Sequence, residues 1–199
     1  HVLTNVHHLV SLHPGARVVF MNDSDCLRLM NSSGTRHLVS ERTMRWYKGD
    51  EGVTRDLRQN MPGTAPYYHG KYLSDLCRLI QLYHFGGVYM DTDLQVVHDI
   101  RPLLTLTNAS FASVLAFSDF DARNDILQAL LASQANTTLI SRAIRYFDEW
   151  INGDRSIYGL AGPSLLSQAI SDEFGIGYMS DVAIRQLRDW GVFLMKEIH

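Results

Sequence analysis

Two aspartates separated by one residue, Asp91 and Asp93, are the first groups in this sequence that could do chemistry. They follow a short apolar run at residues 88–90, which reads as a buried strand. Aspartate favours caps and turns and is depleted in strands, so two of them at this place require a reason. If the backbone stays extended, residues i and i+2 point to the same side, and both carboxylates would face one site.

A divalent cation is the simplest partner for this aspartate pair. Two neighbouring carboxylates repel each other unless a positive charge lies between them. Hard cations such as Mn²⁺ and Mg²⁺ prefer oxygen ligands and often take phosphate oxygens as further ligands. Open α/β sheets also bind their ligands beyond the carboxyl ends of strands. We therefore expect Asp93 and Asp91 to hold Mn²⁺ or Mg²⁺ together with a diphosphate.

A second charged pair, Asp75 and Arg78, precedes the aspartates on a predicted helix. The spacing i, i+3 puts both side chains on one face of that helix. Another face is apolar and carries Leu73, Leu76, Cys77 and Ile80. Taken alone, the charged pair is most simply a solvated ion pair that contributes little to stability. Because the helix runs through Gly86 and Gly87 directly to the aspartates, we expect it to lie alongside their strand.

Hydrophobic periodicity and turn residues predict the elements that position these groups. We expect helices over residues 2–12, 73–84, 126–133, 139–150 and 162–170, and strands over residues 16–21, 88–90, 111–117 and 192–195. Residues 22–70 are expected to be polar and irregular, with short elements at most. An alternation of strands with helices indicates an α/β domain.

Composition limits the class of protein. A length of 199 residues is typical of one domain, and we expect a single domain over residues 1–199. The net charge of -3, with no long run of Lys and Arg, gives no electrostatic support for a nucleic-acid partner. No stretch approaches the roughly 18 apolar residues of a membrane helix. Because the chain begins at His1 without Met, we expect it to be a fragment of a longer chain.

Asparagine and cysteine residues bear on the compartment. The N-glycosylation acceptor pattern occurs at Asn22, Asn31, Asn108 and Asn136. These patterns favour a protein of the secretory lumen, although they also occur in proteins that never meet the glycosylation machinery. The two cysteines, Cys26 and Cys77, either pair with each other or stay free, and both alternatives fit the sequence.

One extended pattern at residues 72–97 combines the charged groups. It consists of Ser74, Asp75, Arg78, Tyr83, Gly86, Gly87, Tyr89, Asp91 and Asp93. The pattern resembles the DXD sugar-binding region of family 32 glycosyltransferases, in particular their α-1,4-galactosyltransferases and initiating α-1,6-mannosyltransferases. Segments at residues 11–23, 123–140 and 159–170 resemble flanking parts of the same family.

The resemblance implies both a fold and an activity. The fold would be GT-A-like, a Rossmann-like domain with a central mixed, mainly parallel sheet flanked by helices. The activity would be that of a metal-dependent, retaining transferase that moves a hexose from a UDP- or GDP-sugar to a glycan, glycolipid or protein acceptor. Residence in the Golgi lumen, with a membrane anchor upstream, is favoured. A microbial cytosolic enzyme is the alternative.

The resemblance also implies roles for individual residues. Asp93 would ligate the metal most directly, and Asp91 would contact the ribose or the sugar of the donor and also the metal through water. Asp75 and Arg78 would hold hydroxyl groups of the donor sugar. The other residues implied in substrate binding are Gly87, Tyr89, Gly162 and Pro163, of which the last two would shape a loop that opens a helix.

Two other functions compete with this interpretation. A haloacid-dehalogenase-like phosphatase also places Asp-x-Asp after an apolar strand. It expects this motif near the start of the chain, with Thr or Val two residues after the second Asp. Here the motif lies in the middle of the chain, and Gln95 stands at that position. A non-catalytic nucleotide-sugar-binding domain would keep the aspartates and bind the donor without turning it over. The helix with Asp75 and Arg78, joined through two glycines to the aspartates, favours the transferase.

Overall fold

The computed structural model describes residues 2–60, 69–101, 110–118, 123–155, 161–176, 186–189 and 191–196. The helices are α1 (Val2–Leu12), α2 (Asp23–Met30), the short 3-10 helix η1 (Arg36–Leu38), α3 (Glu41–Tyr47), α4 (Glu51–Asn60), α5 (His69–Phe85), α7 (Thr138–Asn152) and α8 (Ala161–Phe174). The strands are β1 (Gly87–Met90), β2 (Phe111–Ser118), β3 (Arg123–Ser133) and β4 (Val192–Lys196). Helices and strands occur together, which confirms the α/β class.

The described strands form one four-stranded sheet in the order β1-β3-β2-β4. Strand β3 is antiparallel to both of its neighbours, β1 and β2. Only the pairing of β2 with β4 is parallel. The sheet is therefore mixed, as expected, but the expectation that it is mainly parallel is wrong for the part of the chain that the structure describes.

The antiparallel pairings arise from β3. The expectation of a helix over residues 126–133 is wrong, because these residues form a strand. The segment contains a run of apolar residues, and periodicity alone does not distinguish a buried strand from a buried helix. Its middle position in the sheet decides the outcome, since Gly87–Met90 pairs with it on one side and Phe111–Ser118 on the other. Ile126 and Leu131 are fully buried there.

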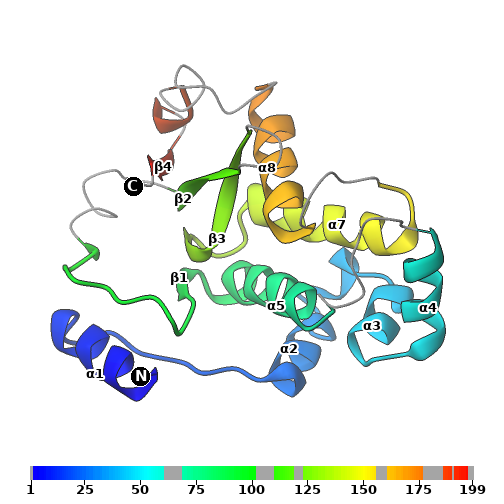
Figure 1. Cartoon of the computed structure of the whole chain (residues 1–199), viewed down its shortest axis with the longest axis horizontal. Coiled ribbons are helices and arrows are strands. Elements are labelled where there is room, and N and C mark those ends of the chain that lie inside the picture. Colours follow the sequence, from blue (N-terminus) through cyan, green and yellow to red (C-terminus); the bar gives the residue numbers. More distant parts are fainter. Residues whose placement is uncertain are drawn as a thin grey trace.

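Helices α5, α7 and α8 pack together beside the sheet and supply most of the core (Figure 1). Their fully buried side chains include Leu76, Leu79 and Ile80 of α5, Ile140, Ile144 and Phe147 of α7, and Leu165 and Leu166 of α8. The expected helices over residues 139–150 and 162–170 and the expected strand over residues 192–195 are confirmed. The site described below therefore rests on this buried core.

The N-terminal part differs from expectation at two places. The described residues 22–60 contain three α-helices (α2, α3 and α4), because polar residues that look like loop residues act as caps. Asn22 forms a capping box with Asp25, and the Ser40 hydroxyl caps α3. Residues 16–22 have no regular secondary structure, so the strand expected there is wrong. A strand requires a hydrogen-bonded neighbour, and no described strand lies beside this segment.

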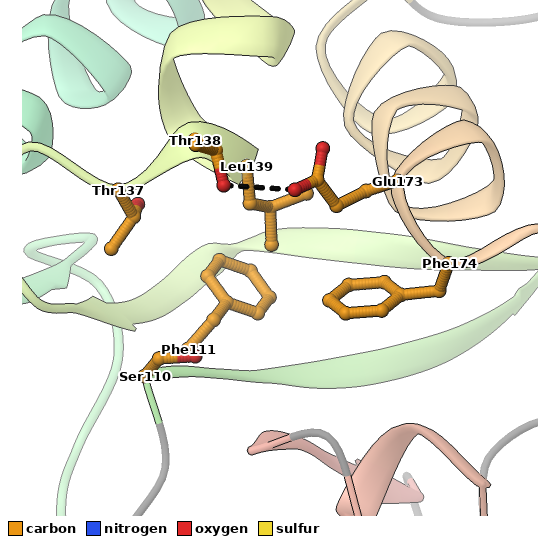
Figure 2. A pocket seen from close by; sticks show the side chains of 7 residues that line it. All are labelled: Ser110, Phe111, Thr137, Thr138, Leu139, Glu173 and Phe174. Atoms are coloured by element: carbon orange, nitrogen blue, oxygen red, sulfur yellow. Dashed lines mark hydrogen bonds between the residues drawn. The ribbon is translucent and has the colours of Figure 1, made fainter.

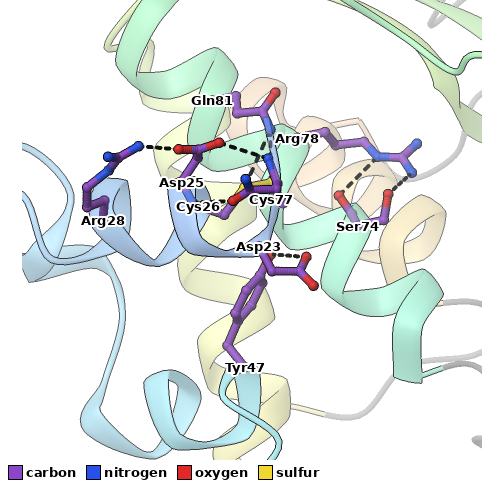
Figure 3. The surroundings of a disulfide bond; sticks show 10 residues. Asp23, Asp25, Cys26, Arg28, Tyr47, Ser74, Cys77, Arg78 and Gln81 are labelled. Carbon is purple, nitrogen blue, oxygen red and sulfur yellow. Dashed lines mark hydrogen bonds and ion pairs between the residues drawn. A yellow bond between two sulfur atoms is a disulfide. The ribbon is translucent and has the colours of Figure 1, made fainter. Parts of the chain in front are cut away.

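A disulfide joins α2 to α5 through Cys26 and Cys77, whose Cα atoms are 5.6 Å apart. This settles the open question of whether the two cysteines pair. Cys77 lies between Asp75 and Arg78 on α5, and Figure 3 shows Arg78 and the disulfide on the same stretch of that helix. The bond therefore holds the helix that carries the candidate site. None of the described helices is both long enough and apolar enough to cross a membrane.

Candidate functional site

The turn between α5 and β1 brings the two charged pairs together. The Gly86 amide donates to the Leu82 carbonyl at 2.8 Å and ends the helix. Gly86 has a φ of 64°, and a Cβ at this position would lie only 2.7 Å from the Ala135 nitrogen. Glycine is therefore required, since other residues rarely adopt this conformation and have no room here. The chain reverses within two residues, and β1 then runs alongside α5.

Arg78 lies at the centre of the site and is only 6% exposed. Its Nη2 is 3.1 Å from Oδ1 of Asp75, and its Nη1 is 3.5 Å from Oδ1 of Asp91. The guanidinium also donates to the Gln128 carbonyl at 2.6 Å and to the Ser74 hydroxyl at 3.0 Å. The interpretation of Asp75 and Arg78 as a solvated surface pair is therefore wrong, because the pair is buried and contacts the DXD strand.

The Asp75 carboxylate is only 2% exposed. Burial raises the pKa of Asp75 to about 6, while the positive charges of Arg78 and Lys71 oppose the shift and the charge of Asp91 adds to it. Oxygen Oδ1 pairs with Arg78, whereas oxygen Oδ2 is buried and has no hydrogen-bond partner in the described part of the chain. The carboxylate therefore keeps one acceptor that a ligand could use.

Tyr89 fixes the orientation of Asp91. Its hydroxyl donates to Oδ1 of Asp91 at 2.6 Å, and its ring lies 4.6 Å from the Arg78 guanidinium carbon. Burial, followed by the hydrogen bond to Asp91, raises the pKa of Tyr89 to about 12. Tyr89 therefore stays protonated and serves as a donor at neutral pH. Asp91 itself is half-buried, so part of its carboxylate faces outward.

The backbone does not stay extended from Asp91 to Asp93. Residues 92–93 form a turn, in which the Leu94 amide donates to the Asp91 carbonyl at 3.2 Å. Asp93 is exposed on this turn. The condition for the same-side orientation expected from strand alternation, an extended backbone, is therefore not met. Helix α1 supports the turn, because the Asn5 side chain donates to the Thr92 carbonyl at 3.0 Å.

The start of α8 closes the other side of the site. Gly162 lies directly against the Asp75 carboxylate, and a Cβ at this position would overlap with it. The Gly162 carbonyl accepts a hydrogen bond from Nε2 of Gln128 at 2.6 Å. Pro163 follows as the third residue of α8 and is half-buried. Pro is tolerated in the first turn of a helix, where its missing N–H is not needed.

Most of the predicted site residues lie in one place. The structure brings together Asp75, Arg78, Tyr89, Asp91 and Gly162. Gly87 stands at the opposite end of β1, where it pairs with Ser133, while Met90 beside the aspartates pairs with Leu130. Gln128 is a site residue that the sequence analysis missed. Its segment reads as a helix, and no short-range pattern links it to α5.

Asp91 and Asp93 are the residues at this edge that could hold a cation. Both offer carboxylate oxygens, which suit a hard cation such as Mn²⁺ or Mg²⁺. The described residues contain no group of three or more His, Cys, Asp or Glu side chains placed to bind a metal. Two carboxylates still fit such an ion, because Mg²⁺ is commonly held by one or two carboxylates with water and substrate phosphates.

A separate cavity of about 270 Å³ lies near the other end of the sheet. Figure 2 shows its lining, in which a hydrogen bond of 2.8 Å from Thr138 to Glu173 links α7 to α8 above the rings of Phe111 and Phe174. Phe111 pairs with Ser133, which also pairs with Gly87 at the start of β1. None of the predicted site residues lines this cavity, so it is distinct from the site around Arg78.

Comparison with known proteins agrees with the geometry. The family described as a glycosyltransferase sugar-binding region containing a DXD motif matches residues 1–111. Over 98 residues the chain is 30% identical to lactosylceramide 4-alpha-galactosyltransferase of Rattus norvegicus, covering 48% of this chain and 23% of that protein. The similarity to the enzyme of the same name from Pongo pygmaeus is 31% over 96 residues, covering 48% of this chain and 38% of that protein. The matched region thus spans well under half the length of these relatives.

Proposed function

The chain belongs to the family of glycosyltransferases with a DXD-containing sugar-binding region, and we propose that it transfers a hexose from a nucleotide diphosphate sugar in a metal-dependent reaction. The acceptor would be a glycan, a glycolipid or a protein, and the anomeric configuration of the sugar would be retained. The observation that carries this proposal is the buried Arg78, which contacts both Asp75 and Asp91. A GT-A-like fold is part of the proposal.

Each side chain of the site has a task in this reaction. Asp75 accepts hydrogen bonds from hydroxyl groups of the donor sugar through its unpartnered Oδ2. Arg78 holds Asp75 and Asp91 in place and brings a positive charge close to the donor. Tyr89 keeps Asp91 oriented through a hydrogen bond of 2.6 Å. The N-terminus of α8 at Gly162 presents backbone N–H groups that favour an anion.

The cation would be held by Asp93 and Asp91. When bound, Mn²⁺ or Mg²⁺ supplies Lewis-acid stabilisation of the negative charge that develops on a diphosphate leaving group. The exposed position of Asp93 on the turn suits contact with a ligand that arrives from solvent. Retention of configuration rests on the family resemblance, since no described residue is singled out as a general base near an acceptor hydroxyl.

The similar proteins suggest which substrates to test first. Both carry the name lactosylceramide 4-alpha-galactosyltransferase. We therefore propose UDP-galactose as the first donor and a glycolipid such as lactosylceramide as the first acceptor. UDP-GlcNAc, UDP-glucose and GDP-mannose complete the donor panel, because the described residues of the site do not single out one hexose.

The secretory lumen, and the Golgi within it, is the compartment that we propose. Disulfides persist in oxidising compartments and are rare in the cytosol, and Cys26 is bonded to Cys77. The glycosylation acceptor asparagines Asn22, Asn31 and Asn136 are all exposed, as an attached glycan requires. Asn108 lies outside the described residues. A microbial cytosolic location is less compatible with the disulfide.

The experiment that tests this function is a radiochemical transfer assay. The protein is incubated with Mn²⁺ and each of the four donors, and both transfer to lactosylceramide and hydrolysis to free sugar are measured. We expect turnover of one donor that requires Mn²⁺ and is lost in Asp93→Ala, a change at an exposed position, but not in Arg28→Ala. Donor binding without turnover would indicate a binding domain instead. Release of phosphate from simple phosphate esters, with no use of any donor, would indicate a phosphatase.

A further inference from the structure

Gln128 contacts both α5 and the start of α8, the two helices that flank the proposed donor site, although it lies on neither helix. It lies on the middle strand β3 and is only 3% exposed. Its backbone carbonyl accepts a hydrogen bond from Nη1 of Arg78 on α5 at 2.6 Å. Its Nε2 donates to the carbonyl of Gly162 at the start of α8, also at 2.6 Å. One residue therefore contacts the guanidinium on one side and the helix N-terminus on the other.

The side-chain oxygen Oε1 of Gln128 is buried and has no hydrogen-bond partner among the described residues. The amide orientation follows from chemistry, because the Gly162 carbonyl can only accept and so must face the NH₂ group. Within the described residues, the other buried side-chain atom without a partner is Oδ2 of Asp75. Gly162 lies against that Asp75 oxygen and accepts from Nε2 of Gln128, so the two residues with unpartnered acceptors contact the same glycine.

Two buried, unpartnered acceptors on residues that contact the same glycine carry information about what binds here. A buried polar atom without a partner costs about 1–3 kcal/mol, so such atoms are rare unless a ligand or water completes them. Neither the Gln128 oxygen nor the ionised Asp75 carboxylate can donate, so the missing partner must bring hydrogen-bond donors. A phosphate is excluded on this ground, whereas sugar hydroxyl groups fit.

We propose that Gln128 is a specificity-determining residue of the donor site, whose Oε1 accepts a hydrogen bond from a hydroxyl group of the donor sugar beside the hydroxyl held by Asp75. This inference rests on the proposed glycosyltransferase function. A neutral amide is suited to the position, because it adds an acceptor without adding a second negative charge next to Asp75. Sites that hydrogen-bond a hydroxyl group discriminate strongly against an analogue that lacks it.

The test is a cycle that combines one substitution with removal of single hydroxyl groups. Binding of UDP, UDP-galactose and its 2-, 3-, 4- and 6-deoxy analogues is measured by calorimetry with Mn²⁺ on the wild type and on Gln128→Leu. We expect the wild type to bind at least two deoxy analogues about tenfold more weakly than UDP-galactose, because Asp75 and Gln128 each hold one hydroxyl group. In Gln128→Leu the tenfold preference disappears for one of these hydroxyl groups and is kept for the other, while the affinity for UDP is unchanged.

Gln128→Leu also removes the hydrogen bond from Nε2 to the Gly162 carbonyl. The deoxy analogues separate this structural effect from the loss of Oε1. Loosening of α8 would weaken all sugars by the same factor and leave every deoxy ratio unchanged. Gln128→Met, which keeps the length of the side chain, replaces Gln128→Leu if the latter does not fold. Gln134→Leu, at an exposed position just after β3, is the matched control and keeps all ratios.

The outcomes separate this inference from the function on which it rests. Identical deoxy ratios in the wild type and in the Gln128 variants would overturn the inference alone and would point to a trapped water at Oε1. If the wild type binds none of UDP, UDP-galactose, GDP and GDP-mannose in the presence of Mn²⁺, the proposed function fails, and the inference fails with it.

Discussion

Nη1 of Arg78 lies 3.5 Å from Oδ1 of Asp91, although one residue belongs to a helix and the other follows a strand. The turn at Gly86 makes this possible, since it folds β1 back along α5. The same guanidinium is 3.1 Å from Asp75. Helix α5 and the end of β1 are thus joined by the buried guanidinium of Arg78.

Replacement of Arg78 by alanine should strongly destabilise the protein. Removal of one partner of a buried ion pair leaves the other charge unpaired and typically costs about 3–5 kcal/mol. The matched control is Arg28→Ala, because Arg28 pairs with Asp25 at the same i, i+3 spacing but is 78% exposed. An exposed pair contributes about 0–1 kcal/mol. Urea unfolding of both variants measures the contrast, and equal losses would contradict the account.

Folding stability should fall as the pH rises from about 4 to about 6, because of Asp75. The pKa of this carboxyl is about 6 in the folded protein, above its ordinary 3.8. Between these values the unfolded chain loses its proton first, so ionisation favours unfolding. The shift corresponds to about 3 kcal/mol.

Urea unfolding of the wild type and of Asp75→Asn across this pH range, without divalent cations, measures the effect. The wild type should lose up to about 3 kcal/mol more than the variant, which cannot ionise at this position. Parallel curves for the two proteins would show that the Asp75 carboxyl titrates normally.

Gly162→Ala should disturb the donor site through Asp75. The added Cβ would overlap with the buried carboxylate, and overpacking of this kind costs about 1–3 kcal/mol. We also expect weaker binding of UDP-galactose, because the carboxylate must move. Gly70→Ala on α5 is the control, since a Cβ there meets nothing within 4 Å. If both variants unfold and bind like the wild type, the close approach of Gly162 to Asp75 is refuted.

Loss of the disulfide should weaken the helix that carries the site. The bond closes a loop between residues 51 positions apart, and such bonds contribute about 2–4 kcal/mol. The double variant Cys26→Ser, Cys77→Ser should be less stable by this amount. Thermal unfolding with and without dithiothreitol checks the cause, because reductant should destabilise the wild type and leave the double variant unchanged. Equal sensitivity of both proteins would argue against the Cys26–Cys77 bond.

The parts of the site that lie close in sequence were predictable. Asp75, Arg78 and Asp91 lie within one helix-turn-strand unit, and helix periodicity followed by two glycines determines how that unit folds. Spacing alone placed Asp75 and Arg78 on one face, but it could not show that this face is buried. That depends on β3 and α8, which come from later parts of the chain.

The contribution of Gln128 could not be predicted, because its contacts are long-range. Its hydrogen bonds reach Arg78 and Gly162, which are 50 and 34 positions away in the sequence. Its strand was also mistaken for a helix, since an apolar run fits both. In the N-terminal region, Asn22 and Ser40 looked like loop residues, whereas they cap helices.

The central claim is a metal-dependent nucleotide-sugar site at Asp91 and Asp93, and calorimetric titration of UDP and of GDP, each with and without Mn²⁺, tests it most directly. The wild type should bind one of the two nucleotides at least about tenfold more tightly with Mn²⁺, a difference of about 1.4 kcal/mol. Asp93→Ala should lose this metal-dependent gain and keep its fold, because Asp93 is exposed. Binding of both nucleotides that is the same with and without Mn²⁺ in both proteins would contradict the claim.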